Sequence, residues 1–173
     1  MNTSNIKKYA PQARNDFIAA MRKQAAKYGI TADSILPAEQ KGDLLLIGDQ
    51  VFPLSVMKSR EKLIKRIQTS SFEQTIDYIA YSWFNRLCAI RYMECKGLLD
   101  HGRRVLSSAD GSAGLPQILE ECLDIDLPGL DASRVAELKL DGNKDEELYR
   151  ELLLAQCHAL NQVMPLLFEQ VSD

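Results

Sequence analysis

The chain has 173 residues, of which 46% are hydrophobic and 26% are charged, and its formal net charge at pH 7 is −3. This length and apolar content predict one folded domain with a substantial core rather than a disordered chain. No apolar run approaches the roughly 18 residues of a membrane span, and the opening MNTSNIKKYAPQ lacks the apolar core of a secretory signal. Because the four cysteines include no C-x-x-C pair, we expect reduced thiols in a cytoplasmic protein.

Charge is distributed unevenly along the chain. Residues 1–70 contain 12 basic and 6 acidic residues, whereas residues 101–173 contain 6 basic and 14 acidic residues. A basic N-terminal part could attract a polyanion. Two solvated faces of opposite sign are the simpler interpretation, and we favour it.

The N-terminal third predicts an arm, a helix and a small sheet. Residues 1–10 are expected to form a polar arm, and Pro11 suits the first position of a helix that ends at Gly29. Residues 31–42 predict a loop. Two short apolar runs then flank Gly48 and Asp49, which predicts a β-hairpin over residues 44–54. The alternative is an extended loop that packs its leucines on the helices.

The next segment, Ser55 to Gln68, has the apolar periodicity of a helix and is the most basic stretch of the chain. Five of its positions carry positive charge: Lys58, Arg60, Lys62, Lys65 and Arg66. These residues are candidates for contacts with DNA phosphates. Because no aromatic residue is interleaved with the charges, we favour an ordinary solvated helix face.

A long central helix is predicted over residues 71–96. Ser71 and Gln74 have the spacing of a capping box, and Gly97 suits a left-handed stop. One apolar stripe runs along this helix and includes Ile76, Ile79, Ala80, Trp83, Leu87 and Ile90. Phe84, Cys88 and Tyr92 predict a second apolar side, so we expect the helix to be buried with Trp83 in the interior.

A polar group interrupts this central helix. Glu94 continues the apolar stripe, Arg91 lies one turn earlier, and Arg86 lies on the flank. The group could form a binding site at an interface with a catalytic domain or with DNA. A partly buried ion pair that fixes the packing of the helix is the favoured interpretation, since a lone buried carboxylate would be costly.

The remainder predicts a Gly/Ser-rich loop over residues 98–115, short helices at Leu115–Leu123 and Ser133–Leu140, and a C-terminal helix over residues 143–169. Pro165 is expected to kink or end that last helix. The predicted fold is therefore mainly α, an irregular multi-helix bundle around a long central helix, with one small β-hairpin.

No catalytic, cofactor-binding or metal site is predicted. Glu137-Leu138-Lys139 matches the E-x-K triplet of some nucleases, but helical positions i and i+2 point in different directions. Cys157 and His158 are adjacent on a predicted helix and do not converge on a metal.

Three stretches carry a family resemblance: WFNRLCAIRYMECKG (residues 83–97), NIKKYAPQARNDF (residues 5–17) and LLLAQCHALNQVMP (residues 152–165). They resemble the N-terminal region of PglX, the adenine-specific DNA methyltransferases of BREX phage-defence systems, and of some fused restriction–modification enzymes. The resemblance implies an N-terminal piece of an enzyme that transfers a methyl group from S-adenosylmethionine to adenine N6.

The family's catalytic devices are not in this sequence. Its Asn/Asp-Pro-Pro-aromatic loop is missing because no two prolines are adjacent, and the Gly111–Gly114 run follows no strong strand. The resemblance thus implies a domain without catalysis of its own. Its partners would be the remainder of the methyltransferase and, through the basic residues, duplex DNA or other BREX components. The alternative is a free-standing helical protein-interaction module with no nucleic-acid role.

Overall fold

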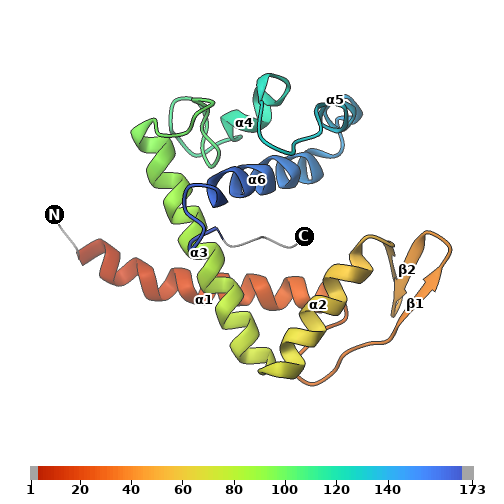
Figure 1. Cartoon of the computed structure of the whole chain (residues 1–173). Coiled ribbons are helices and arrows are strands. Elements are labelled where there is room, and N and C mark those ends of the chain that lie inside the picture. The colour runs from red at the N-terminus through yellow and green to blue at the C-terminus, as the bar shows by residue number, and fades with distance from the viewer. Residues whose placement is uncertain (1–3, 169–173) are drawn as a thin grey trace. The chain divides into compact units, whose positions relative to one another are not determined.

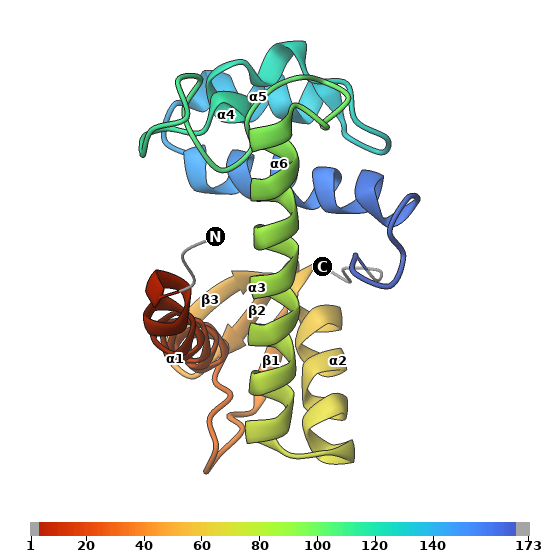
Figure 2. The same ribbon diagram turned by 90° about the vertical axis from the view of Figure 1, so that its left-hand side faces the viewer.

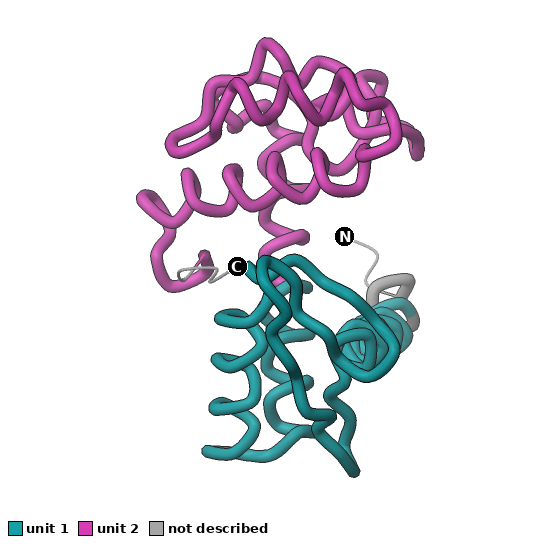
Figure 3. Tube along the Cα trace, turned by 90° about the vertical axis from the view of Figure 1, so that its right-hand side faces the viewer, with its two compact units in different colours: residues 1–84, 173 teal, residues 85–172 magenta. Residues whose placement is uncertain are grey.

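The computed structural model describes residues 4–168, and this part of the chain is mainly helical with one small antiparallel sheet (Figure 1). The predicted fold class is confirmed. Where the sequence predicted one domain, the chain divides into two compact units, and the division falls between Phe84 and Asn85 (Figure 3). We call the N-terminal part unit 1 and the C-terminal part unit 2.

Three helices form the larger core of unit 1: α1 (Ser4–Lys27), α2 (Val56–Thr69) and the first half of α3 (Phe72–Lys96). Within this unit α1 and α2 lie on two sides of α3 (Figure 2). Their shared core contains Ala25, Ile30, Phe72 and Ile76, with Ile18, Met21, Leu63, Ile64 and Ile67 packed against it. The apolar faces of all three helices therefore pack into one common core.

The expected arm at residues 1–10 is wrong for the part that the structure describes. Helix α1 already begins at Ser4, so Pro11 lies inside the helix rather than at its start. Proline costs one backbone hydrogen bond there. Pro11 is exposed, so the carbonyl that loses its donor can be hydrated instead. Residues 1–3 of the expected arm lie outside the described residues.

The sheet of unit 1 has three strands in the order β1-β2-β3: β1 (Ala38–Lys41), β2 (Leu44–Ile47) and β3 (Gln50–Pro53). The predicted hairpin is confirmed, and Gly48 in its two-residue turn has φ +57°, which favours glycine. Strand β1 was predicted as loop because AEQK shows no apolar alternation; pairing with β2 gives it its structure.

Helix α3 agrees with the predicted central helix. The Gln74 amide donates to Ser71 Oγ (3.2 Å), and Gly97 at φ +64° follows the last turn, where the Leu98 amide donates to the Met93 carbonyl (2.9 Å). The expectation that Trp83 lies in the interior is only partly confirmed, because Trp83 is half-buried. The second apolar side is wrong beyond Phe84, because Cys88 and Tyr92 are exposed.

Unit 2 contains the second half of α3, a long loop, α4 (Gln117–Glu120), the 3₁₀ turn η1 (Cys122–Asp124), α5 (Ala132–Asp141) and α6 (Asp145–Asn161). Helix α6 packs against both α4 and α5 (Figure 2). Residues that are almost fully buried here include Ile90, Val105, Ile118, Leu138, Leu148 and Leu152. The predicted loop over residues 98–115 indeed contains neither helix nor strand.

The C-terminal helix differs from the prediction at both ends. Helix α6 begins at Asp145, after Lys144 rather than Asn143, and it ends at Asn161. Pro165 has no N–H to continue the hydrogen-bond ladder and disfavours the helical conformation at Met164. The chain turns instead and buries Phe168. Glu169, the predicted end, lies outside the described residues.

Candidate functional site

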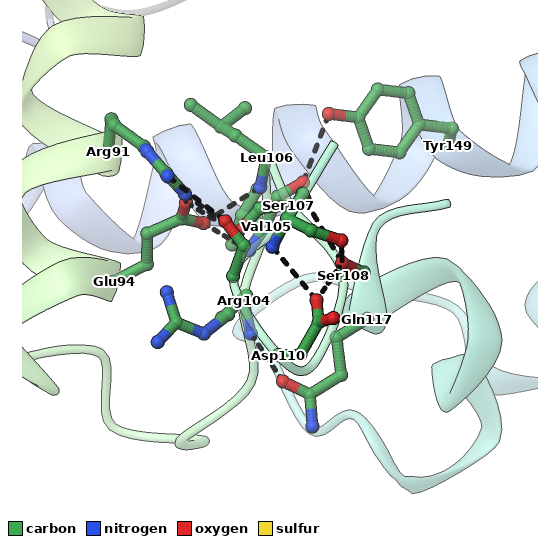
Figure 4. A network of polar contacts seen from close by, with 12 residues as sticks. Arg91, Glu94, Arg104, Val105, Leu106, Ser107, Ser108, Asp110, Gln117 and Tyr149 are labelled. Atoms are coloured by element: carbon green, nitrogen blue, oxygen red, sulfur yellow. Dashed lines mark hydrogen bonds and ion pairs between the residues drawn. The ribbon is translucent and has the colours of Figure 1, made fainter. Parts of the chain in front are cut away.

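The most organised polar site of unit 2 is centred on Glu94, whose side chain is completely buried at the end of α3 (Figure 4). One carboxylate oxygen, Oε2, accepts hydrogen bonds from the amides of Val105 and Leu106, both at 2.8 Å. The other, Oε1, accepts from Ser107 Oγ at 3.0 Å and forms an ion pair with Arg91. A carboxylate with two backbone donors and two side-chain donors is fully satisfied.

Arg91 connects the carboxylate to the surrounding loop. Its Nη1 also donates to Ser107 Oγ at 2.7 Å, while Nη2 lies 3.4 Å from the Gly111 carbonyl. The Arg91 side chain is 45% exposed, so one side of the ion pair remains in contact with solvent. Only the carboxylate is buried, whereas the guanidinium remains partly hydrated, which reduces the desolvation cost of the ion pair.

The loop around Glu94 is held by further hydrogen bonds to unit 2. The Arg104 amide donates to Gln117 Oε1 at 3.0 Å, and the Ile118 amide donates to the Arg104 carbonyl at 2.9 Å. Tyr149 of α6 donates to the Val105 carbonyl at 3.0 Å (Figure 4). Because no strand pairs with this loop segment in the described part of the chain, Glu94 supplies the acceptor for the amides of Val105 and Leu106.

A second carboxylate closes the tip of the same loop. Asp110 accepts from Ser108 Oγ at 2.6 Å and from the Ser112 amide at 2.8 Å. These hydrogen bonds, that of Ser108 first, lower the pKa of Asp110 from 3.8 to about 2. The carboxylate of Asp110 is therefore ionised at neutral pH and stabilises the turn at this tip.

The electrostatics of Glu94 favour a permanent charge. Burial by itself raises the pKa of the Glu94 carboxyl, but the hydrogen bonds from Leu106, Arg91, Ser107 and Val105 outweigh it, and the pKa is lowered from 4.5. The hydrogen bond with Glu94 raises the pKa of Arg91 in turn. A carboxylate that stays ionised and has all its donors inside the fold suits structural organisation rather than proton transfer.

Arg86 does not join this polar group. It lies more than one turn of α3 before Arg91, is only 8% exposed, and its Nε lies 3.3 Å from the Leu167 carbonyl. Burial raises the pKa of the Cys157 thiol to about 11, and the positive charge of Arg86 opposes that shift. The three residues predicted as one group therefore form two separate contacts, Arg91–Glu94 and Arg86–Leu167.

The basic residues of α2 are likewise divided by the structure. Arg60 is only 8% exposed, and its guanidinium donates to the carbonyls of Tyr28 (2.9 Å) and Leu36. Burial lowers the pKa of Arg60. The expectation that Arg60 belongs to the solvated face is wrong, because it satisfies the carbonyls that follow α1 and is not available for a phosphate.

The other cations of α2 are exposed. Lys58, Lys62 and Lys65 follow helical i, i+4, i+7 spacing and share one face, and no acid is paired with them in the described part of the chain. The Arg66 guanidinium lies 3.9 Å from the centroid of the Tyr78 ring, in a cation–π contact. The face that could meet a polyanion thus consists of three lysines with Arg66 at its edge.

The remaining sequence candidates are accounted for by structure. Glu137 and Lys139 lie on α5, where Glu137 pairs with Arg134 and Lys139 donates to the Leu119 carbonyl. His101 accepts the Arg103 amide at Nδ1, which leaves its Nε2 to donate to Gln156 at 2.6 Å. Within residues 4–168 no His, Cys, Asp or Glu side chains gather as metal ligands would, and no helix has the length and apolarity for a membrane crossing.

Sequence reasoning found one partner of Glu94, the ion pair with Arg91, and missed the others. The position of Glu94 on an apolar stripe indicated a buried acceptor. Its other donors, however, come from a loop with no periodicity, and two of them are backbone amides that leave no mark in the sequence. The role of Arg60 was missed for a similar reason: its partners are backbone carbonyls.

Over its whole length the chain is similar to adenine-specific methyltransferases. It is 49% identical over 180 residues to adenine-specific methyltransferase BrxX of Escherichia coli O9:H4 (strain HS) and covers 15% of that protein. It is 30% identical over 192 residues to adenine-specific methyltransferase PglX of Lacticaseibacillus casei (strain Zhang) and covers 16% of it. The chain therefore spans about one-sixth of these relatives.

No family model matches the chain. The resemblance predicted from the sequence is nevertheless confirmed, because the full length of the chain aligns with the N-terminal region of both methyltransferases.

Proposed function

We propose that this chain forms the non-catalytic, helical N-terminal domain of a BREX-type adenine-specific DNA methyltransferase. The observation that carries the proposal is the similarity over the whole chain to about one-sixth of two such enzymes. The complete enzyme would transfer the methyl group of S-adenosylmethionine to adenine N6, and this domain would support the catalytic region.

The placement of S-adenosylmethionine outside this chain is supported by the lack of a glycine-rich strand-to-helix turn among the described residues. The nearest glycine-rich run, Gly111 to Gly114, follows no strand, and Asp110 closes it into a turn with Ser108 and Ser112. Gly111 has φ +84° within this turn, and the flexible end of the Arg104 side chain lies beside it. The cofactor would therefore be held by another part of the complete enzyme.

A direct assay tests this proposal. The complete polypeptide and the 173-residue chain are each incubated with tritiated S-adenosylmethionine and genomic DNA. Methyl transfer is expected only with the complete polypeptide, and removal of the region equivalent to residues 4–168 is expected to reduce it. Methyl transfer by the 173-residue chain itself, or none by the complete polypeptide, contradicts the proposal.

The finer part of the proposal is a contact between the exposed lysines of α2 and DNA phosphates. Its support is that Lys58, Lys62 and Lys65 share one exposed helical face and have no acidic partner among the described residues. Each neutralised phosphate contributes about 0.9 to the slope of log K against log salt concentration. Three contacts would therefore contribute a slope of about 3.

Gel shift with a salt titration measures this slope. Replacing all three lysines by glutamine is expected to lower the slope by about 3 and to weaken binding at every DNA sequence. The matched control replaces Lys7, Lys23 and Lys27 of α1, which are also exposed, and removes the same net charge. Equal effects of both triple variants would assign the binding to net charge rather than to α2.

The alternative is an interaction module with no nucleic-acid role. The exposed apolar side chains of the chain, such as Tyr81 (69% exposed) and Leu140 (87% exposed), are the observation that favours it. Absence of DNA binding even at low salt, together with retained methyl transfer by the complete polypeptide, would leave the domain as a protein-binding support.

A further inference from the structure

The sheet of unit 1 has one face whose apolar side chains are exposed or half-buried among the described residues. Its inner face consists of Leu45, Ile47 and Phe52, which are buried and pack with Tyr28, Val56 and Met57. The outer sheet face is defined by four apolar residues of β2 and β3: Leu44, Leu46, Val51 and Pro53. Leu44 lies opposite Pro53 and Leu46 opposite Val51, so the four side chains are neighbours.

The outer sheet face is apolar where water would favour polar residues. An antiparallel sheet with one solvated face normally alternates apolar and polar residues, whereas a strand covered on both faces is a continuous apolar run. Strand β2 reads LLLI, a continuous run, yet Leu44 is 48% exposed and its neighbour Val51 is 59% exposed. The sequence of β2 is therefore that of a strand covered on both faces.

The border of the face is charged. Strand β1 contributes Glu39 opposite Leu46 and Lys41 opposite Leu44, and the two charges pair with each other at 3.8 Å. An apolar patch with a charged border is the usual pattern of a protein-docking surface. Single exposed apolar residues are common, whereas the largest contiguous apolar patch on a protein surface is often functional. Leu44, Val51 and Pro53 are exposed and Leu46 is half-buried, so the four form one contiguous patch.

The size of the patch limits what can cover it. Four partly exposed side chains present on the order of 300 Å², well below the ~800 Å² per partner that a stable complex between separate molecules buries. A covalently attached segment does not need so large an area, because its effective concentration is high. The aligned relatives supply such a segment, since the greater part of each lies outside the matched region.

From these observations we infer that the outer sheet face docks against the remainder of the methyltransferase polypeptide, through an apolar surface of that part. The inference rests on the proposed function, because it requires the longer chain. In the complete polypeptide Leu44 and Val51 are buried, and the small sheet is the attachment point of unit 1.

Carbene footprinting of the complete polypeptide and of the 173-residue chain tests this docking. Labelling of the peptide over residues 44–53 is expected to fall at least ~5-fold in the complete polypeptide. Equal labelling in the two proteins overturns the inference. Protection that disappears on dilution, with a halved native mass, also overturns it and assigns the face to a second copy.

A variant pair supplies the second measurement. The sheet variant combines Leu44→Thr and Val51→Thr, and threonine favours the strand conformation at these two exposed positions. The control Leu140→Gln removes one exposed leucine from α5. In the 173-residue chain the sheet variant is expected to shift the Tm by about 1 °C at most, because both side chains are half in water. In the complete polypeptide it is expected to lower the Tm by about 4 °C or more, and Leu140→Gln to leave the Tm unchanged.

The two failures are distinguishable. A complete polypeptide that methylates DNA but shows no protection of residues 44–53 and no Tm effect of the sheet variant refutes the docking alone. A complete polypeptide that transfers no methyl group refutes the proposed function, whatever the footprint shows.

Discussion

Removal of the Glu94 carboxylate tests the organisation of unit 2 most directly. Glu94→Ala leaves the amides of Val105 and Leu106 without their acceptor and leaves Arg91 without its ion-pair partner. Val105 is fully buried, so its amide bears the whole desolvation cost, whereas Leu106 is only partly buried. An unsatisfied buried donor costs about 1–3 kcal/mol.

The sum of these losses sets the expected magnitude. Two stranded amides and a lost charge-assisted hydrogen bond give about 3–5 kcal/mol, similar to the cost of breaking a buried pair. The Arg91 side chain is 45% exposed and can be hydrated, which keeps the estimate at that level. Since a domain of this size is stable by about 5–15 kcal/mol, the variant should fold but melt much earlier.

The assay combines urea unfolding followed by circular dichroism with amide hydrogen exchange at Val105 and Leu106. Glu94→Ala is expected to speed exchange at both amides at least ~100-fold. The matched control is Glu151→Ala, which removes an exposed glutamate from α6 and should change stability by less than about 0.5 kcal/mol. Unchanged exchange at the two amides, or a wild-type unfolding midpoint, would refute the role assigned to Glu94.

Three further outcomes are expected. Because folding lowers the pKa of Glu94 from 4.5, the contribution of its charge to the free energy of unfolding is complete above pH 4.5 and is lost as the pH falls through the folded pKa. Below pH 4.5 the urea midpoint of Glu94→Gln should therefore decline less than that of wild type. Arg60→Gln should lower the free energy of unfolding in urea by about 2–4 kcal/mol, because the carbonyls of Tyr28 and Leu36 lose their donor. The control Lys62→Gln on the same helix should leave it unchanged, and equal midpoints of the two variants would disprove the role of Arg60. In the native protein a thiol reagent should modify the exposed Cys88 within minutes. Cys157 should react only on unfolding, because its thiol is buried and its pKa is raised to about 11; rapid reaction of Cys157 in the native protein would contradict this burial.

The helices and the hairpin could be predicted because their signals are local. Helix α3 has an apolar stripe, a capping serine at Ser71 and a glycine stop at Gly97, and each of these acts within a few residues. The hairpin of β2 and β3 follows from two apolar runs around Gly48. In these segments local chemistry and tertiary packing favour the same structure.

The errors arose where a distant contact decides the structure. Strand β1 has no strand-like sequence and is ordered by pairing with β2. Arg60 reads as a surface cation, but two carbonyls that follow α1 bring it into the interior. Cys88 and Tyr92 are apolar enough for a core, yet nothing in the sequence shows that their side of α3 remains exposed.

The polar site of unit 2 could be predicted only in part. A glutamate on an apolar stripe with an arginine one turn earlier indicated an ion pair, and Glu94 and Arg91 do form one. Arg86 was grouped with them because sequence spacing gives no sign of its contact with Leu167, which is far away in the chain. The backbone donors of the loop cannot be inferred from residue types at all.

The hydrogen bonds of Glu94 mean that the conformation of residues 98–115 depends on a residue outside that segment. A graft of the loop onto another helical scaffold would carry its serines and glycines but leave behind the carboxylate that receives two of its amides. Engineers who wish to transplant or redesign this loop should therefore move the end of α3, with Glu94 and Arg91, as part of the same cassette.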